Sequence, residues 1–102
     1  MIIEVADIRI QPGQQAAFEE AIHRGVRTVI AQATGFLGYT VSKGIESPER
    51  FLLQIQWETL ENHTVDFRGS ERFAQWRAIV GPFFANAPVV EHFAPTTAPS
   101  QG

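Results

Sequence analysis

Hydrophobic and polar residues alternate with a period of two in four segments of the chain, and this alternation predicts β-strands. We expect strands over residues 2–10, from about Gly38 to Glu46, from Arg50 to Glu58 and from Val89 to Phe93. Apolar side chains lie on both faces of the first strand, and the second face of the third strand is mixed rather than charged. Both faces of the resulting sheet are therefore expected to be covered, at least in part.

Residues 14–33 repeat with a helical period instead, after the strand-ending pair Pro12 and Gly13. Gly35 follows the last periodic residue, which is where the glycine after a helix C-terminus belongs. The predicted inward stripe of this helix consists of Phe18, Ala21, Ile22, Gly25, Val29 and Ala33.

Two shorter helices are expected between the third and fourth strands. The first covers about residues 60–67 and can be capped by Thr59, and the second begins at Glu71 and can be capped by Ser70. The side chains of the first that point inward are predicted to be Leu60, His63, Thr64 and Phe67. The second places Phe73, Trp76 and Val80 on one side before Gly81 and Pro82 break it.

The order strand, helix, strand, strand, helix, strand predicts an α+β ferredoxin-like fold with a four-stranded antiparallel sheet and helices on one face only. We expect one domain over residues 1–94, and a disordered tail over residues 95–102, because the sequence PTTAPSQG has the composition of disordered segments. The open face of such a sheet is partly apolar, which favours a homodimer that packs sheet against sheet. Phe84 and Phe93 are the predicted aromatic contacts of that dimer.

The composition indicates how the fold is stabilised and which classes of partner are excluded. The chain of 102 residues and 11.4 kDa contains no cysteine but carries eight Phe, two Trp and one Tyr, so its stability must come from a dense core and an oligomer interface. The net charge of −3, without a cluster of basic residues, makes nucleic acid an unsuitable partner. No apolar stretch is long enough to span a membrane and the first residues do not resemble a signal peptide, so we expect a cytoplasmic protein.

Five segments together resemble one known family. These are a first strand ended by Pro-Gly, the turn GFLGY, the segment QWETLENH, the run FRGSERFAQW and the ending VGPFFANAPVVEHF. In order and spacing they resemble the antibiotic biosynthesis monooxygenase (ABM) domain family over about residues 2–94. The resemblance implies a dimeric ferredoxin-like fold with a pocket between the sheet and the helices of each protomer.

The same resemblance implies several activities. Family members include cofactor-free oxygenases that act on polycyclic phenols, haem-degrading enzymes and a small isomerase of signalling metabolites. Alignment on Trp57 places Phe67 where the haem-degrading members carry their axial histidine, and His63 lies about one turn earlier. A haem ligand is therefore not expected at that place.

Two residues are the candidates for catalysis. Trp57 matches a tryptophan that lines the family's pocket, where it would form a flat wall for a planar substrate; alternatively it is a core residue whose indole N–H finds a nearby acceptor. His63 is predicted on the inward face of its helix, where a neutral imidazole can take a proton from a phenol. The alternative is a histidine that packs near the helix N-terminus and forms local hydrogen bonds.

The remaining candidates are predicted to bind substrate. Phe67, Phe73, Trp76 and Phe83 would line the pocket, and Arg77 could bind a carboxylate or phenolate or simply form a solvated ion pair. Gly25 interrupts the inward stripe of the first helix, where glycine costs about 1 kcal/mol relative to alanine. Either the helix approaches the sheet closely at Gly25, or the missing side chain leaves room for a ligand.

The other two histidines decide whether a metal site is expected. His92 can face either the pocket or the dimer, and His23 is predicted on the solvent side of the first helix, so we expect no metal site.

The leading hypothesis is a monooxygenase that needs no metal or flavin and oxidises a small aromatic or quinone-like substrate with O₂. The alternatives are a non-catalytic dimer that binds a small ligand or haem, and a haem-degrading relative.

Overall fold

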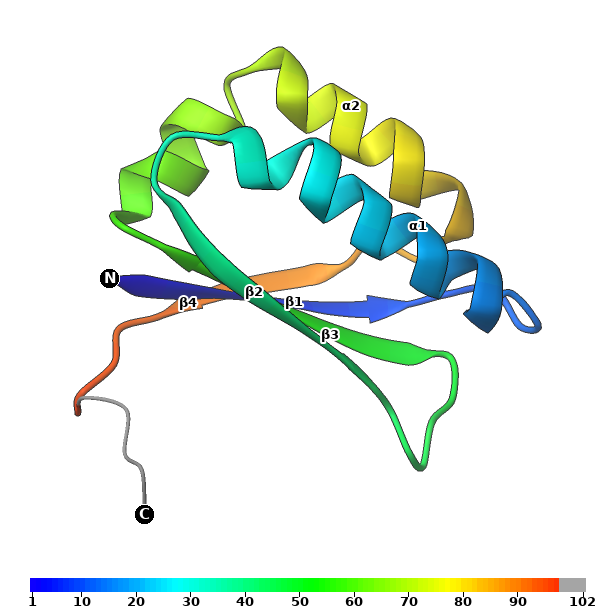
Figure 1. Ribbon diagram of the computed structural model, residues 1–102. Coiled ribbons are helices and arrows are strands. Elements are labelled where there is room, and N and C mark those ends of the chain that lie inside the picture. Colours follow the sequence, from blue (N-terminus) through cyan, green and yellow to red (C-terminus); the bar gives the residue numbers. More distant parts are fainter. Residues whose placement is uncertain (98–102) are drawn as a thin grey trace.

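The structure of the protein is a computed structural model that describes residues 1–97 (Figure 1). Its main elements follow the predicted order and are β1 (Ile2–Arg9), α1 (Gln15–Thr28), β2 (Phe36–Lys43), β3 (Arg50–Trp57), α2 (Glu71–Val80) and β4 (Val89–Phe93). Three short helical segments connect them, namely η1 (Ile30–Gln32), η2 (Asn62–Phe67) and η3 (Gly81–Phe83). Residues 95–97 follow β4 without helix or strand, and the rest of the expected tail lies outside the described residues.

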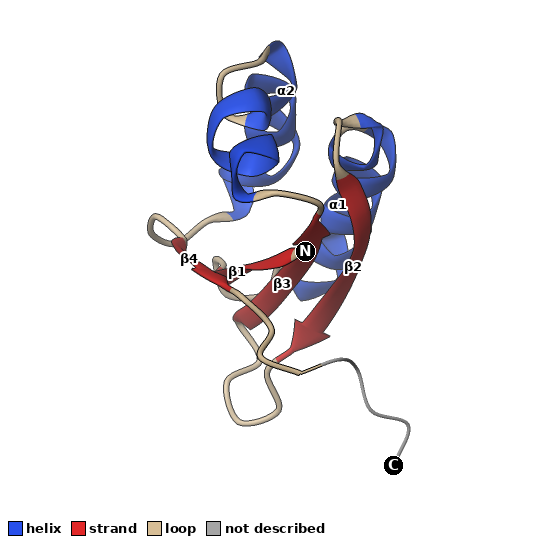
Figure 2. Ribbon diagram, turned by 90° about the vertical axis from the view of Figure 1, so that its left-hand side faces the viewer, coloured by secondary structure: helices blue, strands red, loops and turns tan. Residues whose placement is uncertain are grey.

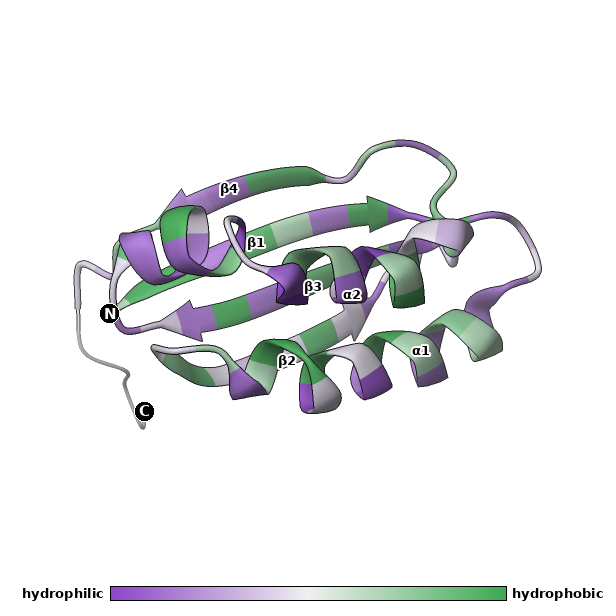
Figure 3. Cartoon of the chain, turned by 90° about the horizontal axis from the view of Figure 1, so that it is seen from above, coloured by the Kyte–Doolittle hydropathy of each residue, from purple (hydrophilic) through white to green (hydrophobic). Residues whose placement is uncertain are grey.

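The four strands form one antiparallel sheet with the order β2-β3-β1-β4. Both helices lie on the same face of this sheet (Figure 2). Seen from above, α1 runs beside β2 and α2 lies over the centre of the sheet (Figure 3). The predicted α+β ferredoxin-like fold is confirmed.

The core lies between the sheet and the helices, where every second residue of the central strands points toward α1 and α2. The four apolar residues of β3 that face the helices, Phe51, Leu53, Ile55 and Trp57, are each at most 1% exposed. They pack against α1, in which Phe18, Ile22 and Val26 are fully buried, although Val26 is not part of the predicted inward stripe. Burial of apolar area on this one face provides the main stabilisation of the fold.

The opposite face of the sheet carries apolar side chains along its two central strands and its β4 edge. Ile3, Val5 and Leu52 are partly buried there, whereas Val89 is 61% exposed and Phe93 is 52% exposed. The cross-strand pairs Ile3↔Phe93 and Asp7↔Val89 bring these residues together on one surface. Dimerisation through this face stays a prediction.

Two of the three expectations about helix ends differ from the structure. The first helix ends at Thr28 rather than at 33, because the chain tightens into η1 before Gly35, whose φ of +86° is favourable only for glycine. Ser70 occupies the N-cap position of α2, but its hydroxyl donates to the Phe67 carbonyl at 2.7 Å instead of capping the helix. Thr59 caps as expected, since its hydroxyl oxygen accepts from the Asn62 N–H at 3.2 Å.

The segment η2 is a π-helix rather than an α-helix. His63 and Phe67 of this segment are buried, but Leu60, which precedes it, is 40% exposed, so the predicted inward position of Leu60 is wrong. Single π-helical turns occur frequently at functional sites. Here the turn sets the angle at which His63 enters the space above the sheet.

Candidate active site

A cavity of about 500 Å³ lies between the helix-facing side of the sheet and the segments η2 and α2. Its floor is formed by small and branched side chains of β1, β3 and β4, and its roof by aromatic side chains of η2 and α2. The loop that precedes β4 closes one side through Asn86, Ala87 and Pro88. This volume is in the usual range for small-molecule pockets, which extends from about 300 to 1,000 Å³.

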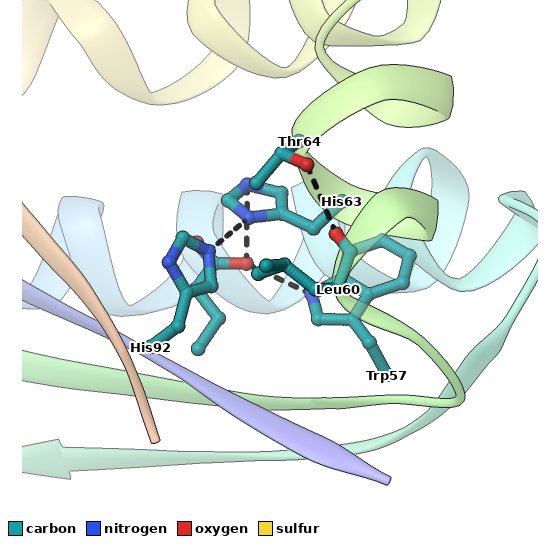
Figure 4. A network of polar contacts seen from close by, with 6 residues as sticks. Trp57, Leu60, His63, Thr64 and His92 are labelled. Carbon is teal, nitrogen blue, oxygen red and sulfur yellow. Dashed lines mark hydrogen bonds and ion pairs between the residues drawn. The ribbon is translucent and has the colours of Figure 1, made fainter. Parts of the chain in front are cut away.

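One end of the cavity is polar, and its groups form a continuous chain of contacts (Figure 4). The Trp57 indole N–H donates to Glu4 Oε1 at 3.0 Å, and His63 Nε2 lies 3.3 Å from the same oxygen. His63 Nδ1 lies 2.8 Å from His92 Nε2. Three strands and η2 therefore contribute one side chain each to a single network.

The network is assembled by strand pairing. Glu4 of β1 lies opposite His92 of β4, and Trp57 at the end of β3 lies opposite Ile2, two residues from Glu4 along β1. The His63 ring stacks on the Trp57 indole with 5.5 Å between centroids and an interplanar angle of 17°. Trp57 thus fixes both Glu4, through its N–H, and His63, through its ring face.

Two arrangements of hydrogens satisfy this chain. In one, His63 donates from Nε2 to the Glu4 carboxylate and accepts at Nδ1 from His92; in the other, a protonated Glu4 donates to His63, which donates to His92. In both arrangements the two ring nitrogens of His63 are occupied by protein groups. His63 can take a proton from a substrate only if one of these contacts opens.

Burial dominates the ionisation of these groups. Burial, together with Arg68 and His92, lowers the pKa of His63 to about 4, so its imidazole is neutral at pH 7. Burial also lowers the pKa of His92, with a smaller contribution from Arg68. Burial raises the pKa of Glu4, while the Trp57 hydrogen bond and the Arg68 charge act in the opposite direction.

Most of the residues predicted from the sequence as catalytic or substrate-binding reach this cavity. Its lining includes His63, Phe67, Phe73, Trp76 and Arg77. Their roles in binding or catalysis stay predictions. The Arg77 guanidinium lies 5.8 Å from the centre of the Phe73 ring, a distance at which a cation and an aromatic face attract each other.

Three predicted residues do not line the cavity. Trp57 is fully buried behind His63, so it supports the wall without forming its surface. Phe83 is absent from the cavity lining and packs edge-on against Phe18, with 5.7 Å between ring centroids. Gly25 lies beneath the Trp76 indole, because an added Cβ would come within 2.8 Å of Trp76 Cζ3.

The Gly25 contact corrects both sequence interpretations. The close approach at Gly25 is made by α2 and not by the sheet, and the indole of Trp76 fills the space that a ligand was expected to use. Gly25 therefore acts on the cavity indirectly, by setting how deeply the Trp76 ring sits against α1.

Among the cavity residues that sequence reasoning missed, one is aromatic and two are charged. Phe84 was assigned to the dimer contact, but it lines the cavity and packs against Phe18 at 6.5 Å, because the bridge Ile10↔Phe84 turns it inward. Glu4 and Arg68 also line the cavity and were not singled out. The available signal was the position of Glu4 on the apolar face of β1, where a charged residue breaks the run formed by Ile2, Ala6 and Ile8.

Within residues 1–97, no group of three or more His, Cys, Asp or Glu side chains is arranged to hold a metal ion. His23 does not line the cavity, but it is partly buried against β2 rather than on the solvent side, and its Nδ1 lies 3.0 Å from the Tyr39 hydroxyl. None of the helices in the described part of the chain has both the length and the apolar character needed to cross a membrane.

Comparison with known proteins assigns the chain to a family. The family model "ABM: Antibiotic biosynthesis monooxygenase" matches residues 1–79. The chain belongs to this family. The uncharacterized protein YczJ of Bacillus subtilis (strain 168) is 38% identical over 93 residues, which cover 91% of this chain and 97% of YczJ.

Solved structures agree with the ABM assignment. A Bordetella bronchiseptica protein named after the same family is 40% identical, with a TM-score of 0.88 over 94% of this chain and 97% of that one. The Streptomyces coelicolor monooxygenase from the gene ActVA-Orf6, solved with the ligand nanaomycin D, is 22% identical with a TM-score of 0.82 over 99% of this chain and 92% of that one. The last likeness shows the fold alone, whereas the family match and the 40% relative support a monooxygenase-type function.

Proposed function

We propose that this ABM protein is a cofactor-independent monooxygenase that oxidises a small aromatic or quinone-like substrate with O₂. The observation that carries the proposal is the cavity itself, with aromatic and aliphatic walls and one polar end where Glu4 and His63 are held. The Streptomyces coelicolor protein of the same fold, a monooxygenase solved with nanaomycin D, supports this use of the cavity by analogy.

The cavity suits a planar phenol. Phe67, Phe73 and Trp76 provide aromatic surface on the roof, and the fixed side chains of β1 and β3 provide a flat apolar floor. Arg68 and Arg77 line the same cavity and supply positive charge beside a substrate that becomes an anion. The resulting selectivity favours aromatic substrates that ionise readily.

The proposed reaction needs no external electrons. An anthrone, in which an activated CH₂ group lies opposite a carbonyl, loses a proton to give an electron-rich anion, and this anion reduces O₂ and combines with it at the same carbon. The resulting hydroperoxide loses water, so that CH₂ plus O₂ becomes C=O plus H₂O. One oxygen atom enters the substrate, the other leaves as water, and the substrate supplies all four electrons that reduce O₂.

The test is oxygen uptake by the purified protein with a panel of anthrones, naphthols and hydroquinones. With ¹⁸O₂ we expect one labelled oxygen in the product, and we expect His63→Gln to reduce kcat/KM by at least tenfold because it disrupts the polar end of the cavity. His23→Gln is the matched control, since His23 lies on α1 away from the cavity. Binding of the aromatic panel without any uptake would refute the oxygenase and favour a non-catalytic binding protein.

Haem binding is the alternative that the same preparation can exclude. Both ring nitrogens of His63 are engaged by Glu4 and His92, so an iron ligand at His63 would cost the polar network one of its contacts. We therefore expect no Soret shift when haemin is added to the protein. A stable shift that disappears in His63→Gln would favour the haem-binding alternative.

A further inference from the structure

The structure raises the question of which atom takes the substrate's proton. His63 is the obvious candidate, but its Nε2 contacts Glu4 at 3.3 Å and its Nδ1 contacts His92 at 2.8 Å. The imidazole presents its ring to the cavity while both of its basic positions are directed at protein groups. Its lone pair is therefore already used in the resting network.

Glu4 is in the opposite situation. Its Oε1 accepts the Trp57 N–H at 3.0 Å and contacts His63, whereas its Oε2 has no hydrogen-bond partner among residues 1–97. No fully shielded side-chain nitrogen or oxygen in the described chain lacks a partner, so Oε2 must be accessible. Because Glu4 is only 6% exposed and lines the cavity, the cavity is the side from which Oε2 is reached.

We propose that Glu4 is the catalytic base of this protein, and that its Oε2 removes the proton from the substrate while Trp57 and His63 hold Oε1. This inference rests on the proposed oxygenase function and names the group that starts the reaction. His63 is then a positioning residue, since it acts on the substrate through Glu4.

The bonding at Glu4 suits a group that gains and loses a proton in each turnover. A proton can bind to Oε2 without breaking any contact, because Oε1 continues to accept from Trp57 and His63. A proton on Oε1 is also compatible with the network: Glu4 then donates to His63 Nε2, and His63 Nδ1 donates to His92 Nε2. Both protonation states of Glu4 therefore keep the contacts among Trp57, Glu4, His63 and His92, and only Oε2 is left free to exchange a proton with the cavity.

The charges around Glu4 act in known directions. His63 of η2, His92 of β4 and Arg68 after η2 face it, and Arg77 of α2 lines the same cavity. Burial raises the pKa of Glu4 above its ordinary value, which makes the carboxylate a stronger base than an exposed glutamate. The nearby arginines favour the anion that the substrate becomes after it has lost its proton.

For an anthrone the steps balance at one carbon. Oε2 takes a proton from the CH₂ group, the carbanion reduces and captures O₂, and the peroxide oxygen takes that proton back from Glu4. Glu4 then removes the remaining C–H proton as the O–O bond breaks, and the departing hydroxide takes that proton to leave as water. The carboxylate is regenerated, and no reductant other than the substrate is consumed.

The experiment compares wild-type protein with Glu4→Gln and Glu4→Asp. Glu4→Gln preserves the size of the side chain and an oxygen acceptor for Trp57 but removes the base, so kcat/KM should fall by about 10²–10⁴-fold, the usual contribution of a general base. Glu4→Asp keeps a carboxylate and should restore part of the loss. Glu46→Gln, in the exposed hairpin between β2 and β3, is the matched control and should retain full activity.

Two readouts separate this role from a structural one. The wild-type kcat/KM should rise with pH as Glu4 loses its proton, with a midpoint above the ordinary glutamate range, and Glu4→Gln should lose this limb. His63→Gln should move the limb without removing it. Under nitrogen in D₂O, wild-type protein should accelerate deuterium exchange at the anthrone CH₂ group, followed by NMR, and Glu4→Gln should not.

The exchange measurement distinguishes failure of this inference from failure of the proposed function. Unchanged exchange and an unchanged pH limb in folded Glu4→Gln would overturn the role of Glu4, even with oxygen uptake intact. Exchange that depends on Glu4 in a protein that consumes no O₂ would support the base and refute the oxygenase. If wild-type protein shows neither exchange nor uptake, both proposals are wrong.

Discussion

Gly25→Ala tests how tightly the two helices meet above the cavity. A Cβ at this position would lie 2.8 Å from Trp76 Cζ3 and 2.9 Å from Trp76 Cε3, whereas ordinary contacts begin at 3.4 Å, so the indole must move by about 0.6 Å. Alanine gains about 1 kcal/mol in helix propensity over glycine, and overpacking of a core costs about 1–3 kcal/mol. We therefore expect a net destabilisation of about 0–2 kcal/mol rather than the gain that an open helix would show.

Urea titration of wild type and Gly25→Ala at the same protein concentration measures this difference. The variant Trp76→Leu provides the control, because it removes the ring atoms that an added Cβ meets. In that background Gly25→Ala should be stabilising, by up to about 1 kcal/mol. Stabilisation by Gly25→Ala in the wild-type background as well would refute the contact between Gly25 and the indole.

Further predictions concern the network and the open sheet face. The pKa of His63 is about 4 in the folded protein and 6.5 in the unfolded chain, so the unfolded chain binds more protons between these values. Stability should therefore rise with pH there, by up to about 3 kcal/mol, and His63→Gln should flatten this slope in urea titrations. The raised pKa of Glu4 has the opposite effect on the pH dependence of stability. The stability that it contributes is lost as pH rises above the ordinary glutamate range, and Glu4→Gln should remove this pH dependence. We propose a homodimer through the open sheet face, so light scattering at micromolar concentration should give twice the mass of 11.4 kDa. Phe93→Lys should reduce this to the protomer mass, whereas Ile45→Lys, at a hairpin position that is 91% exposed, should not.

The strands were predictable because their pattern has a simple physical origin. A sheet covered by helices on one face buries every second residue, and the alternation of Phe51, Leu53, Ile55 and Trp57 reports this burial directly. The ferredoxin-like order then follows from the sequence of strands and helices. The end of α1 was less predictable, because η1 continues the helical periodicity with a different hydrogen-bond pattern after Thr28.

The cavity was harder to predict, because its shape depends on which residues of the irregular segments point inward. Phe83 and Phe84 are adjacent, and a shift of one residue decides which of them faces the cavity; the bridge between Ile10 and Phe84 makes that choice. Likewise, Leu60 just before the π-helix is exposed while His63 within it is buried, although both were expected on the inward face. Neither choice is encoded in local periodicity, since each depends on a contact with a distant strand.

Glu4 is an exception to the expectation that the buried face of a strand is apolar, and it lies at the proposed active site. The buried face of β1 calls for apolar residues, and a carboxylate at that position costs desolvation energy that an aliphatic side chain would avoid. Trp57 offsets part of this cost through one hydrogen bond, but a buried hydrogen bond to a charge is weaker support than an apolar contact of equal size would be. Removal of the carboxylate alone would leave the Trp57 N–H and the facing His63 nitrogen without their partner, whereas an apolar residue in place of the whole network would avoid the desolvation cost. The proposed proton transfer gives this costly arrangement a function.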